Sequence, residues 1–232
     1  GSTRATHYFA TNKVVTLRGK THVAWLDSVS NTMVDTYDHK TGKWAGAVQV
    51  GVGKKRSNHG GPALTCDRRG FLNIFFGPHN GPVFQHHRSR KPNDTTPPWP
   101  PVCEFGHRPT YPSVVCDARN MLHIIYRGSA VQGVASQLLY QRMQVLYRRL
   151  PDRDRWSAPV ALARSPFPNG GYTHYHSALT IDRKHDLHVA YDIYLVPYMP
   201  LAAVYAMLGY VFLLGGYFGP WFQERAPRRV ED

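Results

Sequence analysis

The sequence predicts an all-β fold of β-propeller blades, because one hairpin pattern recurs along the chain. Each copy consists of a short apolar strand, a polar corner and a second strand in which apolar and polar residues alternate. A polar residue, most often histidine, occupies one position of the second strand, and its copies are 51, 50 and 65 residues apart. Repeats of about 40 to 50 residues with several short strands are typical of propeller blades. The equivalent residues are His22, Asn73, His123 and His188.

Tryptophans mark the outer hairpins of the same repeats. Trp44, Trp99 and Trp156 each follow a turn or a proline-rich segment, at spacings of 55 and 57 residues. A bulky aromatic side chain beside a turn suits packing between sheets, so Trp44 is expected to pack against the next blade. This second periodicity supports the repeat interpretation.

The composition is consistent with short strands and turns. The 232 residues include 14 Tyr, 10 Phe and 5 Trp together with 20 Gly and 18 Pro, which favours strands and turns over long helices. Three cysteines do not make a disulfide framework. Cys66 and Cys116 occupy the same strand position in two copies, so both are expected to be small core residues.

The first two blades are expected near the start of the chain. An inner hairpin at 14–28 and an outer hairpin at 33–50 form the first blade. The second blade contains the hairpin at 62–76, with Asp67 at its corner, and a third strand at 83–89. The prolines that follow at 91–101 exclude a central strand there.

Two further copies complete the recognisable repeats. The third blade runs from 111 to about 162, with Asp117 at its corner, and the fourth is recognisable from 172 to 194, with Asp182 at the equivalent place. Four blades are few for closure, so residues 1–194 are expected to be part of a larger propeller.

A separate apolar tail is expected at 195–232. Residues 195–222 contain no charged side chain, which suits a membrane span, an apolar cover for an exposed sheet edge or a disrupted gene end. Prolines and glycines within the segment weaken the expectation of a continuous helix. Residues 1–12 show no signal peptide, so a leader would have been removed or would lie outside this chain.

Candidate site residues stand at the outer ends of two hairpins. His59 and His79 flank the second hairpin, and because the open ends of a hairpin are neighbours in space, both imidazoles are expected at one rim. Tyr111 and Arg127 flank the third hairpin in the same way, so the two adjacent blades are expected to bring all four side chains to one rim. The repeated His22, His123 and His188 are instead expected to be structural, packed between strands. The entrance to the fourth blade is expected to form the next wall of the cleft, through Tyr172, His174 and Tyr175.

Four short motifs stand at the ends of these hairpins. They are Asn-His-Gly-Gly-Pro at 58–62, Gly-Pro-His at 77–79, Thr-Tyr-Pro at 110–112 and Tyr-Arg at 126–127. Together they resemble the seven-bladed propeller polysaccharide lyases that cleave ulvan, within the wider group of BNR-type repeat proteins. The resemblance covers residues 13–194 and implies β-elimination at a uronic acid of a sulfated polysaccharide. It also implies a secreted, periplasmic or cell-surface location.

The resemblance implies a role for each site residue. His59 would be the base, and Tyr111 would be the acid, or both base and acid in a syn elimination. Arg127 would pair with the substrate carboxylate as a planar fork, and His79 would hold or polarise the sugar. Asn58 and the fourth-blade residues would contact the substrate. This chemistry requires neither a metal nor a cofactor.

Other readings of the residues remain open. A zinc site can be drawn from Cys103, His107 and the pair His86 and His87, although the spacing is not a paired Cys-x-x-Cys pattern. A sialidase-like glycosidase needs carboxylates, and the expected rim contains none.

The formal charge of +13 indicates an anionic partner. Scattered basic residues without a recognised motif favour an acidic polysaccharide over nucleic acid, and the rival to an enzyme is a non-catalytic propeller that binds such a polymer.

Overall fold

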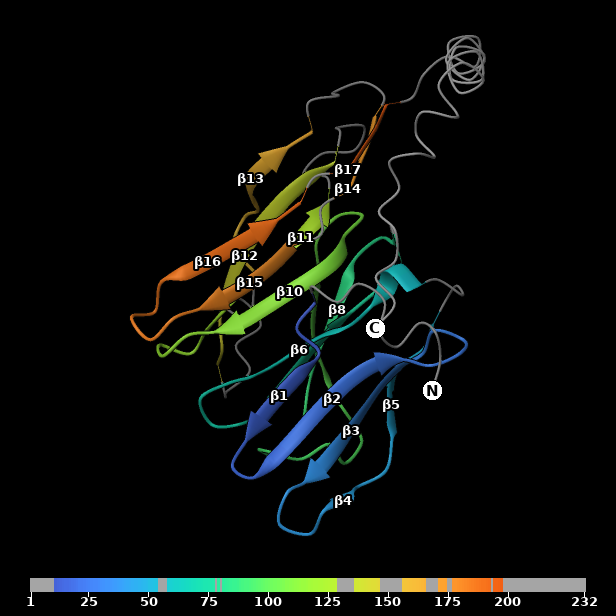
Figure 1. The fold of residues 1–232 in the computed structure, drawn as a ribbon, viewed down its shortest axis with the longest axis vertical. Helices are drawn as coiled ribbons and strands as arrows, with labels where there is room; N and C mark the ends of the chain where they lie inside the picture. The colour runs from blue at the N-terminus through green and yellow to red at the C-terminus, as the bar shows by residue number, and fades with distance from the viewer. Residues whose placement is uncertain are drawn as a thin grey trace, which may run out of the picture. The chain divides into compact units, whose positions relative to one another are not determined.

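The computed structural model describes residues 11–53, 58–77, 79, 81–128, 136–146, 156–165, 171–174, 177–192 and 194–197 (Figure 1). The chain divides into two compact units, Gly1–Val196 and Pro197–Asp232. The expected tail lies outside the described residues, apart from its first three positions. Among the residues that are described, no helix has the length and apolar character needed to cross a membrane.

Sheet 1 contains the first five strands. They are β1 (Val14–Leu17), β2 (Lys20–Leu26), β3 (Thr32–Asp38), β4 (Lys43–Trp44) and β5 (Val48–Gly51). The order is β1-β2-β3-β4, and β5 also pairs with β3. All of these pairings are antiparallel, and a two-residue turn joins β1 to β2.

Sheet 2 is preceded by a 3-10 helix, η1 (Asn58–Gly60). Its strands are β6 (Ala63–Cys66), β7 (Leu72–Phe76), β8 (Phe84–Arg88) and β9 (Pro101–Phe105), in that order and antiparallel. Every residue of β7 is buried, because neighbouring sheets cover both of its faces.

Sheet 3 repeats this plan. Its strands are β10 (Thr110–Cys116), β11 (Met121–Gly128), β12 (Gln137–Gln144) and β13 (Val160–Arg164), again antiparallel and in chain order. The predicted all-β fold with repeated antiparallel sheets is therefore confirmed.

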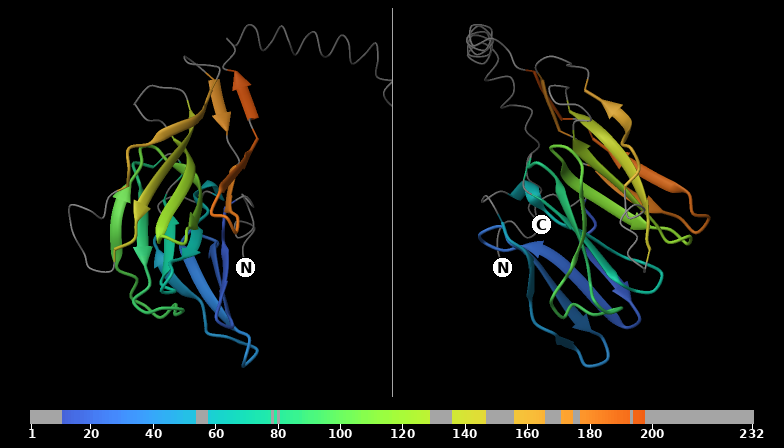
Figure 2. Two further views of the ribbon diagram at one scale, coloured as in Figure 1. Left: turned by 90° about the vertical axis from the view of Figure 1, so that its left-hand side faces the viewer. Right: turned by 180° about the vertical axis from the view of Figure 1, so that it is seen from behind.

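The fourth repeat is described as two strand pairs. β15 (Ser177–Ile181) pairs antiparallel with β16 (Leu187–Tyr191), and β14 (Gly171–His174) pairs with β17 (Tyr194–Pro197). The first strands of successive sheets, β1, β6, β10 and β15, contact one another in sequence. Figures 1 and 2 show β6, β10 and β15 as neighbours from several sides.

The hydrophobic core lies between successive sheets. One cluster joins sheets 1 and 2, through Ala24 and Val34 on one side and Ile74 and Phe76 on the other. A second joins sheets 2 and 3, where Phe75 lies in the same cluster as Ile124. Because side chains alternate between the faces of a strand, neighbouring residues of β7 serve different clusters.

The predicted corner aspartates occupy equivalent turns. In each, Oδ1 accepts backbone N–H groups from the residues two and four positions later, at 3.0 Å for Asp67, 2.7–2.8 Å for Asp117 and 2.8–2.9 Å for Asp182. Asp27 makes the same turn between β2 and β3, at 2.8–2.9 Å, which the sequence interpretation missed. The carboxylate therefore fixes each corner by replacing a backbone acceptor.

The repeated polar position of the second strand is structural in three of its four copies. His22 and Asn73 are fully buried and hydrogen-bonded, and His123 is buried between Asp117 and Tyr140. His188 also contacts its corner aspartate, at 3.1 Å, but its side chain is exposed. The expectation that all three histidines pack between strands is therefore wrong for His188, because β16 has an exposed face among the described residues.

The prediction for Trp44 is also wrong. Trp156 of sheet 3 packs on Phe75, His86 and Phe105 of sheet 2, and Trp99 of sheet 2 joins the cluster with sheet 1. These tryptophans therefore pack on the preceding sheet and not on the next one. No described sheet precedes sheet 1, and Trp44 is 56% exposed beside Tyr37.

Asn12 joins three sheets through hydrogen bonds at their first strands. Its Oδ1 accepts the Val114 N–H at 3.0 Å and the Ser113 hydroxyl, and its backbone carbonyl accepts the Leu64 N–H at 2.6 Å. Its Nδ2 lies 3.5 Å from the Leu179 carbonyl, and the Leu179 N–H donates to Ser113 Oγ at 3.0 Å. One residue thus connects sheets 2 and 3 and the β15–β16 hairpin, through its backbone carbonyl to sheet 2 and through its side chain to the other two.

We expect Asn12→Ala to lower the free energy of unfolding by about 1 to 3 kcal/mol, because two donors of β10 lose their acceptor. Urea unfolding measures this loss. Asn12→Asp retains the acceptor oxygen and is expected to lose less. An Asn12→Ala protein within about 0.5 kcal/mol of the parent would contradict the structural role given to this residue.

His86 is expected to make stability depend on pH. It is buried against Phe75 and bonded to Asn73, and burial holds its pKa well below the ordinary value. The unfolded chain takes up this proton near pH 6.5, so stability is lost as pH falls from about 6.5 toward the depressed folded pKa. Unfolding measured from pH 7 to 5 should show a shallower decline for His86→Gln. The same change at exposed His39 should leave the decline as it is.

Candidate functional site

The site lies at the ends of the first two strands of sheets 2 and 3, opposite the aspartate corners. His59 lies in η1, just before β6, and His79 lies in the turn after β7. Because β6 and β7 are antiparallel, these two positions meet. The imidazole rings stack with centroids 4.2 Å apart and planes inclined by 15°.

Gly77 permits the tight β7–β8 connection that carries His79. A Cβ atom at this position would lie 2.9 Å from the carbonyl oxygen of Val83 and 3.1 Å from the ring of Phe84. Any larger residue would therefore push the two strands apart. The absence of a side chain helps to hold His79 against His59.

Tyr111 is held in an uncommon backbone conformation. Its φ angle is +60°, in the left-handed region that L-residues other than glycine rarely adopt, and this costs on the order of 1–2 kcal/mol. The register between β10 and β11 shifts between Thr110 and Ser113, so Tyr111 lies in a bulge. A bulge redirects a side chain. The ring centroid lies 5.9 Å from that of His59 and 6.4 Å from that of His79.

Arg127 completes the group from the adjacent strand. It pairs with Thr110 in the β10–β11 register, and its Cζ atom lies 5.8 Å from the centroid of the Tyr111 ring. Tyr111 is 2% exposed and Arg127 is 4% exposed. A buried guanidinium in contact with an aromatic face forms a cation–π interaction and provides a fixed positive charge.

A cavity of about 170 Å³ lies on the sheet 1 side of His79. Its apolar walls come from both sheets and include Leu26 and Phe76. Its polar lining comes from the ends of strands and the adjoining loops, and consists of Ser30, Thr32, Gln85 and Glu104. The cavity also borders Gly60, the residue after His59.

The remaining predicted contacts are placed only in part. Asn58 begins η1, and Tyr172 and His174 lie in β14, but the structure describes only the backbone at these three positions. Tyr175 lies outside the described residues. These four assignments remain predictions.

The residues considered for zinc make other contacts. His86 bonds Asn73 through Nε2 and approaches the Cys103 sulfur at 3.9 Å, while His87 Nδ1 contacts the Trp99 carbonyl at 2.9 Å. His107 is exposed. Within the part of the chain that the structure describes, no three His, Cys, Asp or Glu side chains are grouped to hold a metal.

The cysteine thiols take no part in the site. Cys66, Cys103 and Cys116 are free and half-buried, and they pack against the cores between the sheets. Burial raises the pKa of Cys116 to about 12, so its thiol stays protonated at neutral pH. These positions contribute to packing, as predicted for Cys66 and Cys116.

The sequence interpretation missed the polar lining of the cavity. Its residues come from sheets 1 and 2, are far apart in sequence and belong to no motif. Only the packing of one sheet on the other brings them together. Asn12 was missed for the same reason, because a single polar residue before β1 gives no signal of its long-range partners.

Repeated antiparallel sheets that contact one another through their first strands define a propeller-type repeat protein. The model of the BNR repeat-containing family matches residues 20–193, which is three quarters of the chain. This chain belongs to the BNR repeat-containing family.

Sequence comparison relates the chain to ulvan lyases. The ulvan lyase of Alteromonas sp. (strain LOR) is 27% identical over 169 residues, which are 63% of this chain and 33% of that enzyme. The ulvan lyase of Nonlabens ulvanivorans is 36% identical over 78 residues, which are 30% of this chain and 16% of that enzyme. The chain thus matches about a third or less of these relatives.

Structural comparison supports the same relationship at the level of the fold. A solved ulvan lyase of polysaccharide lyase family 25, bound to -[GlcA(1-4)Rha3S]-, superposes with a TM-score of 0.62 at 19% identity. The match covers 80% of this chain and 47% of the lyase. The sheets described above therefore resemble blades of that enzyme.

Proposed function

We propose that this chain is part of a polysaccharide lyase that cleaves a sulfated, uronate-containing polysaccharide such as ulvan by β-elimination. The main observation in support of this proposal is that His59, His79 and Arg127 lie around Tyr111, whose backbone is strained. Strain of this kind persists only where the surrounding structure imposes it, and it is concentrated at functional sites.

The arrangement suits the needs of elimination. Arg127 is a fixed planar cation that can pair with the C6 carboxylate, which makes the C5 proton more acidic. A base removes that proton, the electrons form the C4–C5 double bond, and the C4–oxygen bond breaks. An acid then protonates the departing glycosidic oxygen. The products are a 4,5-unsaturated uronate end and a free hydroxyl on the other sugar.

The same geometry suggests the division of roles. His59 is the proposed base and Tyr111 the proposed acid, with a syn elimination by Tyr111 alone as the other possibility. The Tyr111 ring lies beside both His59 and the Arg127 guanidinium, and one sugar is proposed to contact all three. His79, stacked on His59, is proposed to hold the sugar.

Relatives and topology support the wider proposal. The similar proteins named above are ulvan lyases, and the solved one holds a fragment of glucuronate and 3-sulfated rhamnose. We further propose that the sheets are about four blades of a seven-bladed propeller, and that the protein acts outside the cell or at its surface. Further substrate contacts are assigned to Asn58, Tyr172, His174 and Tyr175.

Incubation of the protein with ulvan tests the function, with the ultraviolet absorbance of the unsaturated uronate as readout. A rise in absorbance supports the lyase. Binding of ulvan without a rise would favour a non-catalytic binding module, which is the second candidate because the chain matches only about half of the solved lyase. If the protein neither binds ulvan nor raises the absorbance, both candidate functions are overturned.

Tyr111→Phe is expected to reduce turnover by at least about 100-fold, because it removes the phenolic proton and keeps the ring. Stability should change little, since the ring packing and backbone are retained. The control is Tyr37→Phe in sheet 1, which makes the same chemical change away from the site. Near-full activity of Tyr111→Phe would remove the tyrosine from its proposed role.

Arg127→Lys is expected to slow elimination by about 10-fold or more, because an ammonium group keeps the charge but cannot present a planar pair of N–H donors to a carboxylate. Initial rates with ulvan measure the effect, and thermal unfolding checks the fold. Arg142→Lys on the exposed face of β12 is the matched control. Equal rates for the two variants would argue against carboxylate pairing by Arg127.

A further inference from the structure

We propose that the corner end of the sheets is a second, non-catalytic binding surface for sulfated polysaccharide. This turn-end surface consists of the turns between the first and second strands of the four repeats, at 18–19, 67–70, 117–120 and 182–186. Each turn carries at least one exposed cation. These cations are Arg18, Arg68, Arg69, Arg119, Arg183 and Lys184.

The turn-end surface is separate from the candidate site. Tyr111 lies at the start of β10 and the 117–120 turn follows its end, so the seven-residue strand lies between them. A strand rises about 3.3 Å per residue, which puts the two ends roughly 20 Å apart. A polymer bound at the turns therefore does not occupy the space around Tyr111 and Arg127.

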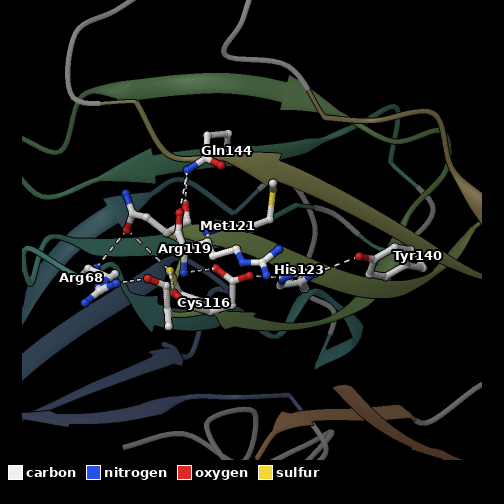
Figure 3. A network of polar contacts seen from close by, with 10 residues as sticks. Arg68, Cys116, Arg119, Met121, His123, Tyr140 and Gln144 are labelled. Carbon is white, nitrogen blue, oxygen red and sulfur yellow. Dashed lines mark hydrogen bonds and ion pairs between the residues drawn. The ribbon is translucent and has the colours of Figure 1, made fainter. Parts of the chain in front are cut away.

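The turns of sheets 2 and 3 form a continuous surface. The Arg68 N–H donates to Asn120 Oδ1 at 3.0 Å, and the Arg68 guanidinium donates to the carbonyl of Ala118 (Figure 3). These contacts join the turn of sheet 2 to that of sheet 3. A guanidinium has five N–H donors, so the contact orients Arg68 and leaves donors for a ligand.

The corner aspartates of these turns accept hydrogen bonds from the backbone. The corner carboxylates accept two amide N–H groups each, and those of Asp117 and Asp182 also contact a histidine. The arginines and lysine beside them are exposed. In the fourth turn, Arg183 and Lys184 are matched by exposed Asp186 and by Asp182, whose side chain is 37% exposed. Exposed cations outnumber exposed acids in the other three turns, where the field is therefore positive.

The outer turns at the same end add to this charge. β3 and β8 run toward this end, and the segments after them carry further exposed cations. Asp38 and Asp94 in these segments accept their own backbone amides. The exposed cations are Lys40, Lys43, Arg90 and Lys91.

The candidate site does not account for the charge of the protein. The formal charge is +13, whereas the convergent site contains one arginine and two histidines. Arginines recognise sulfate groups through paired N–H donors, and a row of them suits a linear polymer with regularly spaced sulfates. The four turns contain no Tyr, Phe or Trp on which bases could stack, which favours a polysaccharide over nucleic acid.

Such a surface would raise the local concentration of polymer near the site. A chain held at the turns cannot diffuse away after a cut, so a second encounter becomes effectively intramolecular. The residues of the turn-end surface take no part in the elimination. Polymer binding at this surface can therefore be tested without measuring lyase activity.

Binding of dextran sulfate, which has sulfates but no uronate, tests the surface directly. The double variant Arg119→Ser with Arg183→Ser removes two cations of the turn-end surface. It is expected to weaken binding on the order of tenfold at low ionic strength and to reduce the dependence of affinity on salt. The matched control, Arg108→Ser with Arg164→Ser, removes the same charge from exposed positions at the other end of the sheets and should bind nearly as the parent does.

Three results would overturn the inference. One is unchanged affinity of the turn-end variant, and another is equal loss in both double variants, which would show a response to net charge alone. The third is tighter binding of a double-stranded DNA fragment than of dextran sulfate at the same salt concentration. The turn-end variant should retain its rate on short ulvan oligosaccharides, whereas Arg127→Lys should lose rate and keep its affinity for dextran sulfate. The two proposals can thus fail independently.

Discussion

The hydrogen bonds of Asn12 are the constraint on which the arrangement of the sheets depends. Successive sheets contact through their first strands, and apolar packing alone does not fix how far one strand slides along the next. The Asn12 side chain fixes this for β10 by binding Ser113 and Val114, and Ser113 in turn binds Leu179 of β15. The Asn12 backbone binds Leu64 of β6. These directional hydrogen bonds therefore set the position of each first strand along its neighbour, and the hydrophobic core stabilises that position.

This anchoring explains how the site can hold a strained residue. Tyr111 lies two positions before Ser113, so the backbone that follows the bulge is fixed by buried hydrogen bonds. The register of β11 places Arg127 beside it, and the packing of η1 against β10 brings His59 to the same place. The energy of the left-handed conformation is offset by contacts elsewhere in the sheet. The result is a preorganised group of three rings, one of which, Tyr111, contacts a buried cation.

The two ends of the sheets differ in electrostatic character for a simple topological reason. At the site end, the segments that follow β2 and β7 contribute Ser30 and His79 to the lining of a cavity. At the corner end, the first hairpins of sheets 2 and 3 each close in a short turn in which an aspartate bonds the backbone and the next side chains face solvent. Arg68 and Arg119 are exposed because the corner aspartate faces inward. Two surfaces with different chemistry follow from one repeated motif.

The sequence alone determined the all-β fold, the repeat and the aspartate corners, because these depend on local alternation and on bonds within a few residues. It also placed His59 near His79 and Tyr111 near Arg127, since the ends of one hairpin must meet. The placement of the two hairpins in adjacent blades further predicted that the two pairs share one rim. Only the tertiary structure decided that Tyr111 has a positive φ and that a cavity lies beside His79. The same is true of the partners of Asn12 and of the exposure of Trp44 and His188. Periodicity shows that one face of a strand is apolar, whereas the neighbour that covers it is set by contacts between residues far apart in the chain.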